Sequence, residues 1–275
     1  MAINLATKYA KKVADKFYLD SVILGKTSNE YDWDGVKSIN VHTITTVAPG
    51  NYTREGTSRY GNPTEVQDSM QTLSITQDKS VALTVDKGNN KQQNMIKNAG
   101  KVMNAELREQ FIPMFDKYAL SVWANFEGVQ TGTDASLTKS NIVEAIGKGI
   151  TALVNKKVPL TNIYVAVGAS NYAKLVNAPE FLNIDKLGEK ALEHGVVGRV
   201  RRAAIIEVPD DYLPEGVNFL MWKKEAVLAP TQIKDMKIHE DAPGISGALL
   251  EVRWLFDAFV LKAKADGIYV SKTAA

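Results

Sequence analysis

The feature that most constrains the fold is a long helical pattern in the middle of the chain. Its apolar positions follow one another at steps of three or four residues: Ile96, Ala99, Met103, Leu107, Phe111, Met114, Tyr118, Val122 and Phe126. A helix over residues 92–126 would be roughly 50 Å long at ~1.5 Å per residue, well beyond the ~11–12 residues of an average helix. Pro113 lies inside the pattern and removes one backbone hydrogen bond, which predicts a kink. A rod of this length outgrows a compact domain and predicts an elongated subunit.

Composition excludes several classes of protein. The 275 residues carry 33 Lys and Arg against 31 Asp and Glu, and this net charge of +2 gives no basic footprint for nucleic acid or anionic lipid. Apolar runs fall short of the ~20 residues of a membrane span, and residues 1–17 lack the apolar block of a secretion signal. The chain has no cysteine, which excludes disulfides, thiolate metal sites and a cysteine nucleophile. These features predict synthesis in a reducing cytoplasm.

The N-terminal region predicts a short amphipathic helix followed by a segment that docks. An apolar stripe recurs every four residues at Leu5, Tyr9, Val13 and Phe17. A helix of this kind packs on protein or lies on a membrane surface, and Asp15 together with the narrow stripe favours protein. Tyr31 and Trp33 predict that the following residues also pack against the body.

Two strand regions flank a long polar segment. Residues 39–47 and 73–85 alternate apolar and polar side chains, with Gln77–Ser80 expected as a turn or a bulge. Between them, residues 48–70 contain glycines and prolines and show no period, and loops of this length are uncommon unless functional or disordered. The segment is either a mobile surface loop or a projecting hairpin that orders against a neighbouring molecule. Side chains typical of interfaces favour the second interpretation: Tyr52, Arg54, Arg59 and Tyr60.

The second half of the chain alternates helices and strands. A turn-rich break is expected at Thr131–Asp134, and then a helix over residues 142–153 with Asn141 and Glu144 as a capping box. The other expected helices are 170–176 and 184–193, and the expected strands are 163–167, 196–200, 203–208 and 217–222. Residues 250–260 alternate most cleanly, and Asp266-Gly267 predicts a hairpin turn into a last strand at 268–270.

No catalytic or metal-binding motif stands out. His42, His194 and His239 are far apart in sequence, and none forms a metal-binding helix pair, so we expect structural or surface roles. Gly147-Lys148-Gly149 fails as a phosphate loop, Gly168-Ala169-Ser170 lacks the second glycine of a nucleophile elbow, and Asp32 with Asp34 lacks further calcium ligands. Asp210 and Asp211 follow Pro209 in a loop without an evident pocket. The basic cluster Arg199, Arg201 and Arg202 suits solvated charges or intersubunit pairs better than phosphate contact.

The order of these elements resembles the major capsid proteins of tailed double-stranded DNA phages, which have the Hong Kong 97-like fold. Local stretches are similar as well: residues 52–63 resemble the tip of the extended loop, and residues 84–90 resemble the start of the spine helix. Residues 195–209 resemble the strands of the axial domain, and residues 256–269 resemble the C-terminal strands. The resemblance covers essentially the whole chain.

The resemblance implies an α+β fold with an N-terminal arm (1–36), an extended β-hairpin loop (37–89), a peripheral domain with the spine helix (90–136), an α/β axial domain (137–235) and return strands of the peripheral domain (236–275). It also implies a structural protein, not an enzyme, without cofactor or metal. Hexamers and pentamers would close an icosahedral head around packaged DNA, with only non-specific DNA contact and no membrane. Tyr52, Arg54, Arg59 and Tyr60 would then lie at contacts between subunits.

A scaffolding protein and a portal are the further partners that the resemblance implies. No long segment precedes the arm, so we expect a separate scaffold, and no residues can be matched to a covalent crosslink. The protein would be assembled in the cytoplasm of a bacterial host and end in the virion. Two alternatives stay open: an encapsulin-type shell that encloses cargo enzymes, and a soluble enzyme with a long inserted loop.

Overall fold

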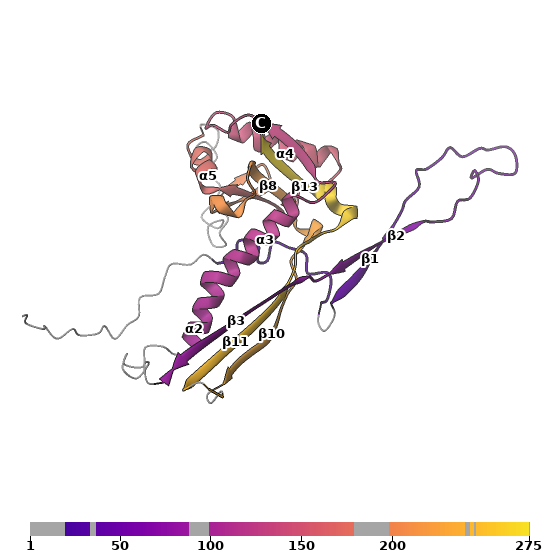
Figure 1. Cartoon of the computed structure of the whole chain (residues 1–275). Coiled ribbons are helices and arrows are strands. Elements are labelled where there is room, and N and C mark those ends of the chain that lie inside the picture. Colours follow the sequence, from indigo (N-terminus) through magenta and orange to yellow (C-terminus); the bar gives the residue numbers. More distant parts are fainter. Residues whose placement is uncertain are drawn as a thin grey trace, which may run out of the picture.

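A computed structural model of the chain describes residues 20–33, 37–87, 99–178, 198–239, 243–244 and 246–274. The structure consists of an elongated part built on a long helix and a narrow sheet, an α/β body at one end, and a hairpin that projects from between them (Figure 1). Several expectations lie outside the described residues: the helix around Leu5–Phe17, the first residues of the long helix, the helix at 184–193, His194 and Asp34.

The α/β body is a six-stranded mixed sheet with helices packed on it. The strand order is β4-β13-β8-β5-β7-β6. The strands are β4 (Gln130–Asp134), β5 (Ile163–Gly168), β6 (Gly198–Val200), β7 (Ala203–Val208), β8 (Val217–Lys223) and β13 (Ile268–Thr273). Helices α4 (Ile142–Asn155) and α5 (Ala169–Val176) bury apolar faces against it. The expected strands at 163–167, 203–208 and 217–222 and the expected helices at 142–153 and 170–176 are confirmed.

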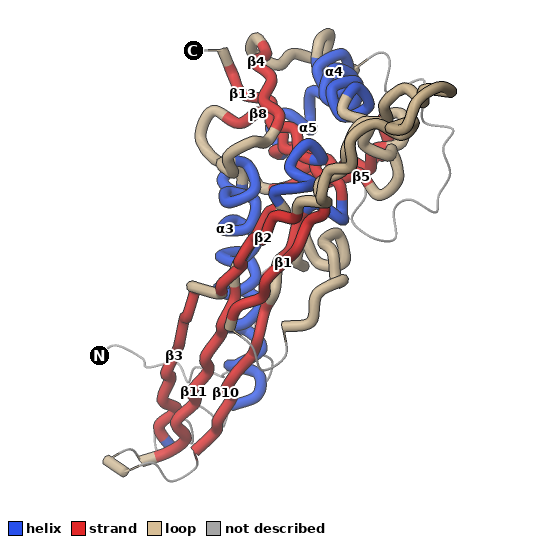
Figure 2. Tube along the Cα trace, turned by 90° about the vertical axis from the view of Figure 1, so that its right-hand side faces the viewer, coloured by secondary structure: helices blue, strands red, loops and turns tan. Residues whose placement is uncertain are grey.

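The elongated part joins a three-stranded antiparallel sheet to the long helix. The sheet order is β10-β11-β3, from β3 (Gln77–Asp86), β10 (Thr231–His239) and β11 (Gly247–Phe256). Leu250, Val252, Trp254 and Phe256 are buried on the face of β11 that meets the helix. The ring of Phe111 stacks on Trp254 at 4.7 Å and meets Phe256 edge-on at 5.5 Å. Figure 2 shows the helix running along this sheet.

The long helix contains a π turn next to its proline. Helix α2 (Ala99–Glu106) continues through π turn η1 (Leu107–Phe111) into α3 (Ile112–Ala124). The N–H of Ile112 donates to the carbonyl of Leu107, five residues back, immediately before Pro113 removes the next donor. The predicted kink therefore takes the form of a five-residue π turn. Met114, expected in the apolar stripe, is 37% exposed because this turn rotates the following residues, and Asp116 is fully buried instead.

Strands β1 (Ser38–Ile44) and β2 (Asp68–Ser74) form a separate two-stranded sheet with seven antiparallel pairs. The root of this hairpin covers a small core of Trp33, Val41, Leu73, Ile75, Leu228 and Leu261. Leu255 and Phe259, which interrupt the polar face of the last long alternating segment, pack against this core, and Phe259 stacks on Trp33 at 5.4 Å. The expected docking of the segment that carries Tyr31 and Trp33 is confirmed.

Three local expectations are wrong. Gln77–Ser80 is neither a turn nor a bulge but the start of β3, because these residues pair with Arg253–Phe256 of β11. Thr131–Asp134 is not a break but part of β4, which pairs in parallel with β13. Glycine is required there because a Cβ on Gly132 would lie 1.8 Å from the hydroxyl of Tyr269. Asn141 makes no capping bond, since its side chain binds the backbone of Ser136 and Thr138.

The expected C-terminal hairpin is also wrong. After β11 the chain forms the short strand β12 (Phe259–Val260), which pairs with β9 (Val227–Leu228). The 3-10 helix η5 (Lys262–Gly267) then contains Asp266-Gly267 and leads into β13. Strand β13 lies between β4 and β8 in the α/β body and not beside β11. Two further 3-10 turns, η3 (Asp210–Tyr212) and η4 (Lys224–Ala226), flank β8.

Candidate assembly surfaces

The tip of the hairpin carries the four residues that the sequence singled out, and it brings the rings of two of them together. The rings of Tyr52 and Tyr60 meet edge-on at 5.1 Å. Across the same loop the N–H of Thr53 donates to the carbonyl of Arg59 at 3.1 Å, and Arg59 Nε donates to the carbonyl of Gly56 at 3.1 Å. Arg54 lies in the turn that these bonds close. The tip is therefore a folded loop that presents two aromatic rings and two arginines.

Exposed apolar side chains are concentrated on the hairpin. In the described part of the chain, eleven large apolar or aromatic side chains are exposed, and six of them lie within 44–70: Ile44, Val47, Tyr52, Tyr60, Val66 and Met70. Tyr60 is 92% exposed and Ile44 is 70% exposed. Such a concentration on a segment that projects from the body makes the hairpin a candidate interaction surface, because isolated exposed apolar residues are normal but clusters of them are not.

Unpaired strand edges provide a second kind of surface. In the described residues, both strands of the hairpin have a free edge, and β3 and β10 form the two edges of the three-stranded sheet (Figure 2). Ile238 on β10 is 48% exposed. Open edges present unpaired N–H and C=O groups and invite pairing with another chain. The subunit thus has open sheet edges as well as the projecting hairpin.

A buried carboxylate that the sequence analysis missed fastens the N-terminal segment to the long helix. Asp116 on α3 is fully buried and accepts hydrogen bonds from the Ser21 hydroxyl and from the N–H of Val22, both at 2.7 Å. Burial raises the pKa of Asp116 to about 6, although these bonds and the nearby Lys26 act in the opposite direction. Burial in turn lowers the pKa of Lys26, whose ammonium donates to the carbonyl of Val22 at 2.9 Å. Asp116 stands three and four residues before Ala119 and Leu120 and so shares their helical face. This spacing is the feature of the sequence that could have identified Asp116 as buried.

The other titratable candidates have local structural roles. His42 and Asp68 approach to 3.3 Å across the hairpin, and His239 and Glu251 do the same across β10 and β11, all well exposed. Asp210 fastens the start of α5: it accepts from the N–H of Ser170 at 3.1 Å and from the Ser170 hydroxyl. A Cβ on Gly168 would lie 2.4 Å from Asp210 Oδ1, so the Gly168–Ser170 motif makes room for this cap.

Arg201 and Arg202, the members of the basic cluster whose side chains the structure describes, have different surroundings. Arg201 occupies the two-residue turn between β6 and β7 with φ +55°, and its guanidinium donates to the hydroxyl of Thr151 on α4 at 3.2 Å. Arg202 instead lines a cavity beside Ile163 and Tyr164. The Arg201 guanidinium is thus directed to a neutral hydroxyl, and a role of the cluster in solvated charges or intersubunit pairs stays a prediction.

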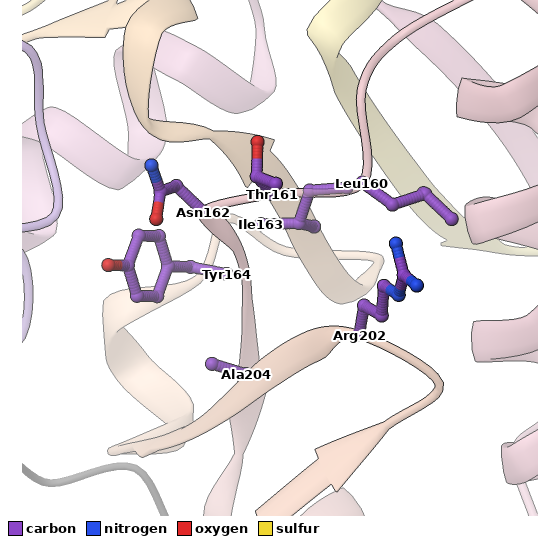
Figure 3. A pocket seen from close by; sticks show the side chains of 7 residues that line it. All are labelled: Leu160, Thr161, Asn162, Ile163, Tyr164, Arg202 and Ala204. Atoms are coloured by element: carbon purple, nitrogen blue, oxygen red, sulfur yellow. The ribbon is translucent and has the colours of Figure 1, made fainter.

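The cavity beside Arg202 does not have the arrangement of an active site. It measures about 410 Å³ and is lined by Leu160, Thr161, Asn162, Ile163, Tyr164, Arg202 and Ala204. Figure 3 shows Asn162 and Tyr164 on one side of β5 and Leu160 with Arg202 on the other, so the polar groups do not converge. Within the described ranges no group of three or more His, Cys, Asp or Glu residues is placed to hold a metal. None of the helices there is long and apolar enough to cross a bilayer.

Comparison with known proteins adds structural relatives but no sequence relatives. No protein-family model and no curated protein matches the chain. A solved structure from Mycobacterium phage Che8 superposes with a TM-score of 0.74 at 17% identity, over 98% of both chains. The capsid structure of cyanophage P-SCSP1u gives 0.73 at 14% identity, over 99% of this chain and 93% of that one. A virus-like particle from Pyrococcus furiosus gives 0.52 at 14% identity, over 86% of each chain.

These matches confirm the fold expectation. The chain has the α+β fold of phage capsid structures along its full length, and it resembles tailed-phage major capsid proteins. The match includes the arrangement of projecting hairpin, long helix and α/β body that the sequence predicted.

Proposed function

We propose that this protein is the major capsid protein of a tailed double-stranded DNA bacteriophage. The observation that carries the proposal is the structural match over 98% or more of the chain to phage capsid structures. A match this complete includes the hairpin and the open sheet edges. Both features expose surface that an isolated subunit would leave without a partner. We assign the chain a structural role rather than a catalytic one.

The shape of the subunit supports assembly into rings. The hairpin on one side of the subunit and the open sheet edges elsewhere suit a head-to-tail contact between different surfaces. Such contacts close into rings when the rotation from one subunit to the next permits it. We infer hexamers and pentamers that close an icosahedral head, with Tyr52, Arg54, Arg59 and Tyr60 at contacts between subunits. In this proposal the arm spans 1–36, the extended loop 37–89, the peripheral domain 90–136 and 236–275, and the axial domain 137–235.

Further partners follow from this role. A head that is filled with DNA requires a portal and, for size control, a scaffolding protein, and we propose both as partners of this chain. The net charge of +2 suits an inner surface that makes weak, non-specific contact with DNA. Assembly would take place in the cytoplasm of the bacterial host, and the mature protein would reside in the virion.

The direct test is to express the chain in bacteria, with and without a candidate scaffold from the same genome, and to examine it by negative-stain microscopy and light scattering. We expect closed shells or ring-shaped capsomers. A strictly monomeric protein in the presence of its scaffold would refute the proposal.

The hairpin tip provides a residue-level test. Removing residues 48–70, or replacing both Tyr52 and Tyr60 by Ala, should leave a folded subunit that does not assemble, because the exposed apolar surface is lost. The matched control replaces Tyr52 and Tyr60 by Phe, which retains both rings, and this variant should assemble. Normal shells from the deletion variant would contradict the role of the tip.

A second candidate is an encapsulin-type shell that encloses cargo enzymes. The similarity to the Pyrococcus furiosus virus-like particle favours it, although over a smaller share of the chain and with a lower TM-score. The contents of purified shells distinguish the two: DNA supports the phage head, and a copurifying enzyme supports the compartment. Portal and terminase genes beside the coding gene would also favour the phage.

A further inference from the structure

One connection between the hairpin and the body is the joint between β2 and β3. Strand β2 ends at Ser74 and β3 begins at Gln77, so Ile75 and Thr76 carry the chain from the two-stranded sheet into the three-stranded sheet. The ladder between β3 and β11 ends with the pair Gln77 and Phe256. One step beyond that pair, Thr76 faces Asp257, the residue that directly follows β11.

Asp257 connects three parts of the molecule at this joint. Its Oδ2 accepts from the N–H of Thr76 at 2.8 Å and from the Thr76 hydroxyl at 2.9 Å. Its Oδ1 accepts from the Tyr118 hydroxyl on α3 at 2.8 Å and from the N–H of Ala258 at 2.8 Å. The residue is only 3% exposed, and these four donors fill the acceptor sites of a carboxylate.

The proton on Tyr118 supports the same arrangement. Burial and the bond to Asp257 raise the pKa of Tyr118 to about 12, so the phenol stays protonated and donates. The edge of the Tyr118 ring also meets Phe256 at 5.7 Å. The long helix, the joint and the end of β11 are therefore held by one carboxylate.

A second polar contact holds the same part of the hairpin. The side-chain amide of Gln71 donates to the carbonyl of Val260 at 3.0 Å and accepts from the N–H of Lys262 at 2.8 Å. Farther out, Ile44 and Met70 are 70% and 58% exposed. The bonds to the body are thus gathered at the root, and the outer hairpin depends on the root for its direction.

We propose that Asp257 is a positioning residue that sets the angle at which the hairpin leaves the body. Apolar contacts in the small core beneath the root stabilise the hairpin but tolerate sliding. The two directed bonds from Thr76, to a carboxylate that Tyr118 and Ala258 hold in place, restrict the geometry of the joint. Strand β2 extends about 23 Å at ~3.3 Å per residue, so a rotation of about 10° at the joint moves its outer end by about 4 Å. Hydrogen bonds at a contact with another subunit do not survive such a shift.

The consequence for assembly depends on the proposed capsid function, whereas the angular role does not. If each subunit grips its neighbour through the hairpin, Asp257 determines the angle between adjacent subunits. We therefore expect its loss to change the curvature or uniformity of the shells rather than the folding of the subunit.

The angle can be measured directly because the chain has no cysteine of its own. Spin labels at Ile44→Cys on the hairpin and Lys101→Cys on α2 report the distance between the hairpin and the long helix. Pulsed electron paramagnetic resonance measures this distance in dilute subunits. We expect one narrow distance in the parent and a distribution displaced or broadened by several Å in Asp257→Asn. Thr72→Val is the matched control, because its hydroxyl bonds to Asn40 within the hairpin and does not cross the joint.

One further variant decides the outcome where Asp257→Asn fails to fold. Thr76→Val removes one of the four bonds and retains the backbone donor, so it decides the outcome if Asp257→Asn does not fold, and it should broaden the distribution more than Thr72→Val. An unchanged distance in folded Asp257→Asn, or in folded Thr76→Val where the first variant fails to fold, overturns the positioning role.

Assembly of the unlabelled proteins separates this role from the proposed function. We expect the parent to form particles of uniform diameter and Asp257→Asn to form particles of mixed diameter or open sheets. A parent that never assembles with its scaffold refutes the capsid function, while the label distances still decide the role of Asp257. Particles of parental diameter and uniformity from Asp257→Asn would show that the joint does not control subunit geometry.

Discussion

Replacing Asp116 by Asn should change how the stability of the subunit depends on pH. Asp116 has a folded-state pKa of about 6, against 3.8 for an unperturbed carboxyl, because burial disfavours the charge. Folding therefore favours the protonated form. The stabilisation linked to this group is fully present below about pH 4 and is lost as the pH rises through about 6, the opposite of an ordinary ion-paired carboxylate.

The size of the effect follows from the shift. A difference of about two pKa units at 1.36 kcal/mol per unit corresponds to about 3 kcal/mol over the whole titration, and most of this change falls between pH 4 and pH 7. In Asp116→Asn the amide oxygen can still accept from Val22, and the hydroxyl of Ser21 can turn to accept from the new NH₂ group. The variant should therefore gain stability relative to the parent as the pH rises, by up to about 3 kcal/mol.

Urea denaturation of dilute subunits between pH 4 and pH 8 measures this difference. The control is Asp211→Asn, which removes an exposed carboxylate paired with Lys117 of α3 and so makes the same change in charge at the surface. Hydrogen exchange of residues 20–28 at each pH identifies whether the gain lies in the docked segment. A constant difference between parent and Asp116→Asn across this range would refute the reasoning.

Other substitutions test packing in the α/β body, each by urea denaturation. Gly132→Ala should cost about 1–3 kcal/mol because the new Cβ would lie 1.8 Å from the Tyr269 hydroxyl, whereas Gly147→Ala on open α4 should stabilise by up to about 1 kcal/mol; equal effects would contradict the close approach. Leu153→Ala should cost about 2–5 kcal/mol because Leu153 is fully buried, and its neighbour Val154→Ala, 45% exposed, should cost well under 1 kcal/mol; a small loss from Leu153→Ala would mean that the core refills the space.

Elements with a strong local period were predictable from the sequence. The period of α4 and the uninterrupted apolar run of β5 depend only on near neighbours, and both are found within two residues of their expected bounds. The exposure of the four residues at the hairpin tip was also predictable, because they stood in a segment without core residues, whereas their place at contacts between subunits stays a prediction.

Long-range pairing explains most of the failures. Gln130–Asp134 is polar and contains a glycine, so nothing local identifies it as a strand, and it becomes one only because β13 lies beside it. Asp266-Gly267 has the chemistry of a hairpin turn, but the chain there passes from one sheet to another. Asp116 and Asp257 look like ordinary surface residues until the segments that supply their hydrogen bonds are brought in from about a third to two-thirds of the chain away.

The strand order also determines when a newly made chain can fold. Strand β3 pairs with β11, and β4 pairs with β13, so each sheet needs residues from both sides of the inserted α/β segment. During synthesis β3 and β4 cannot pair until β11 and β13 have emerged from the ribosome, and such non-local pairings form slowly. A half-made subunit has neither the three-stranded sheet nor the joint that holds the hairpin. In the proposed capsid, a chain that lacks β11 and β13 would therefore lack the surfaces it needs to join an assembly, and truncated products would be kept out of the shell.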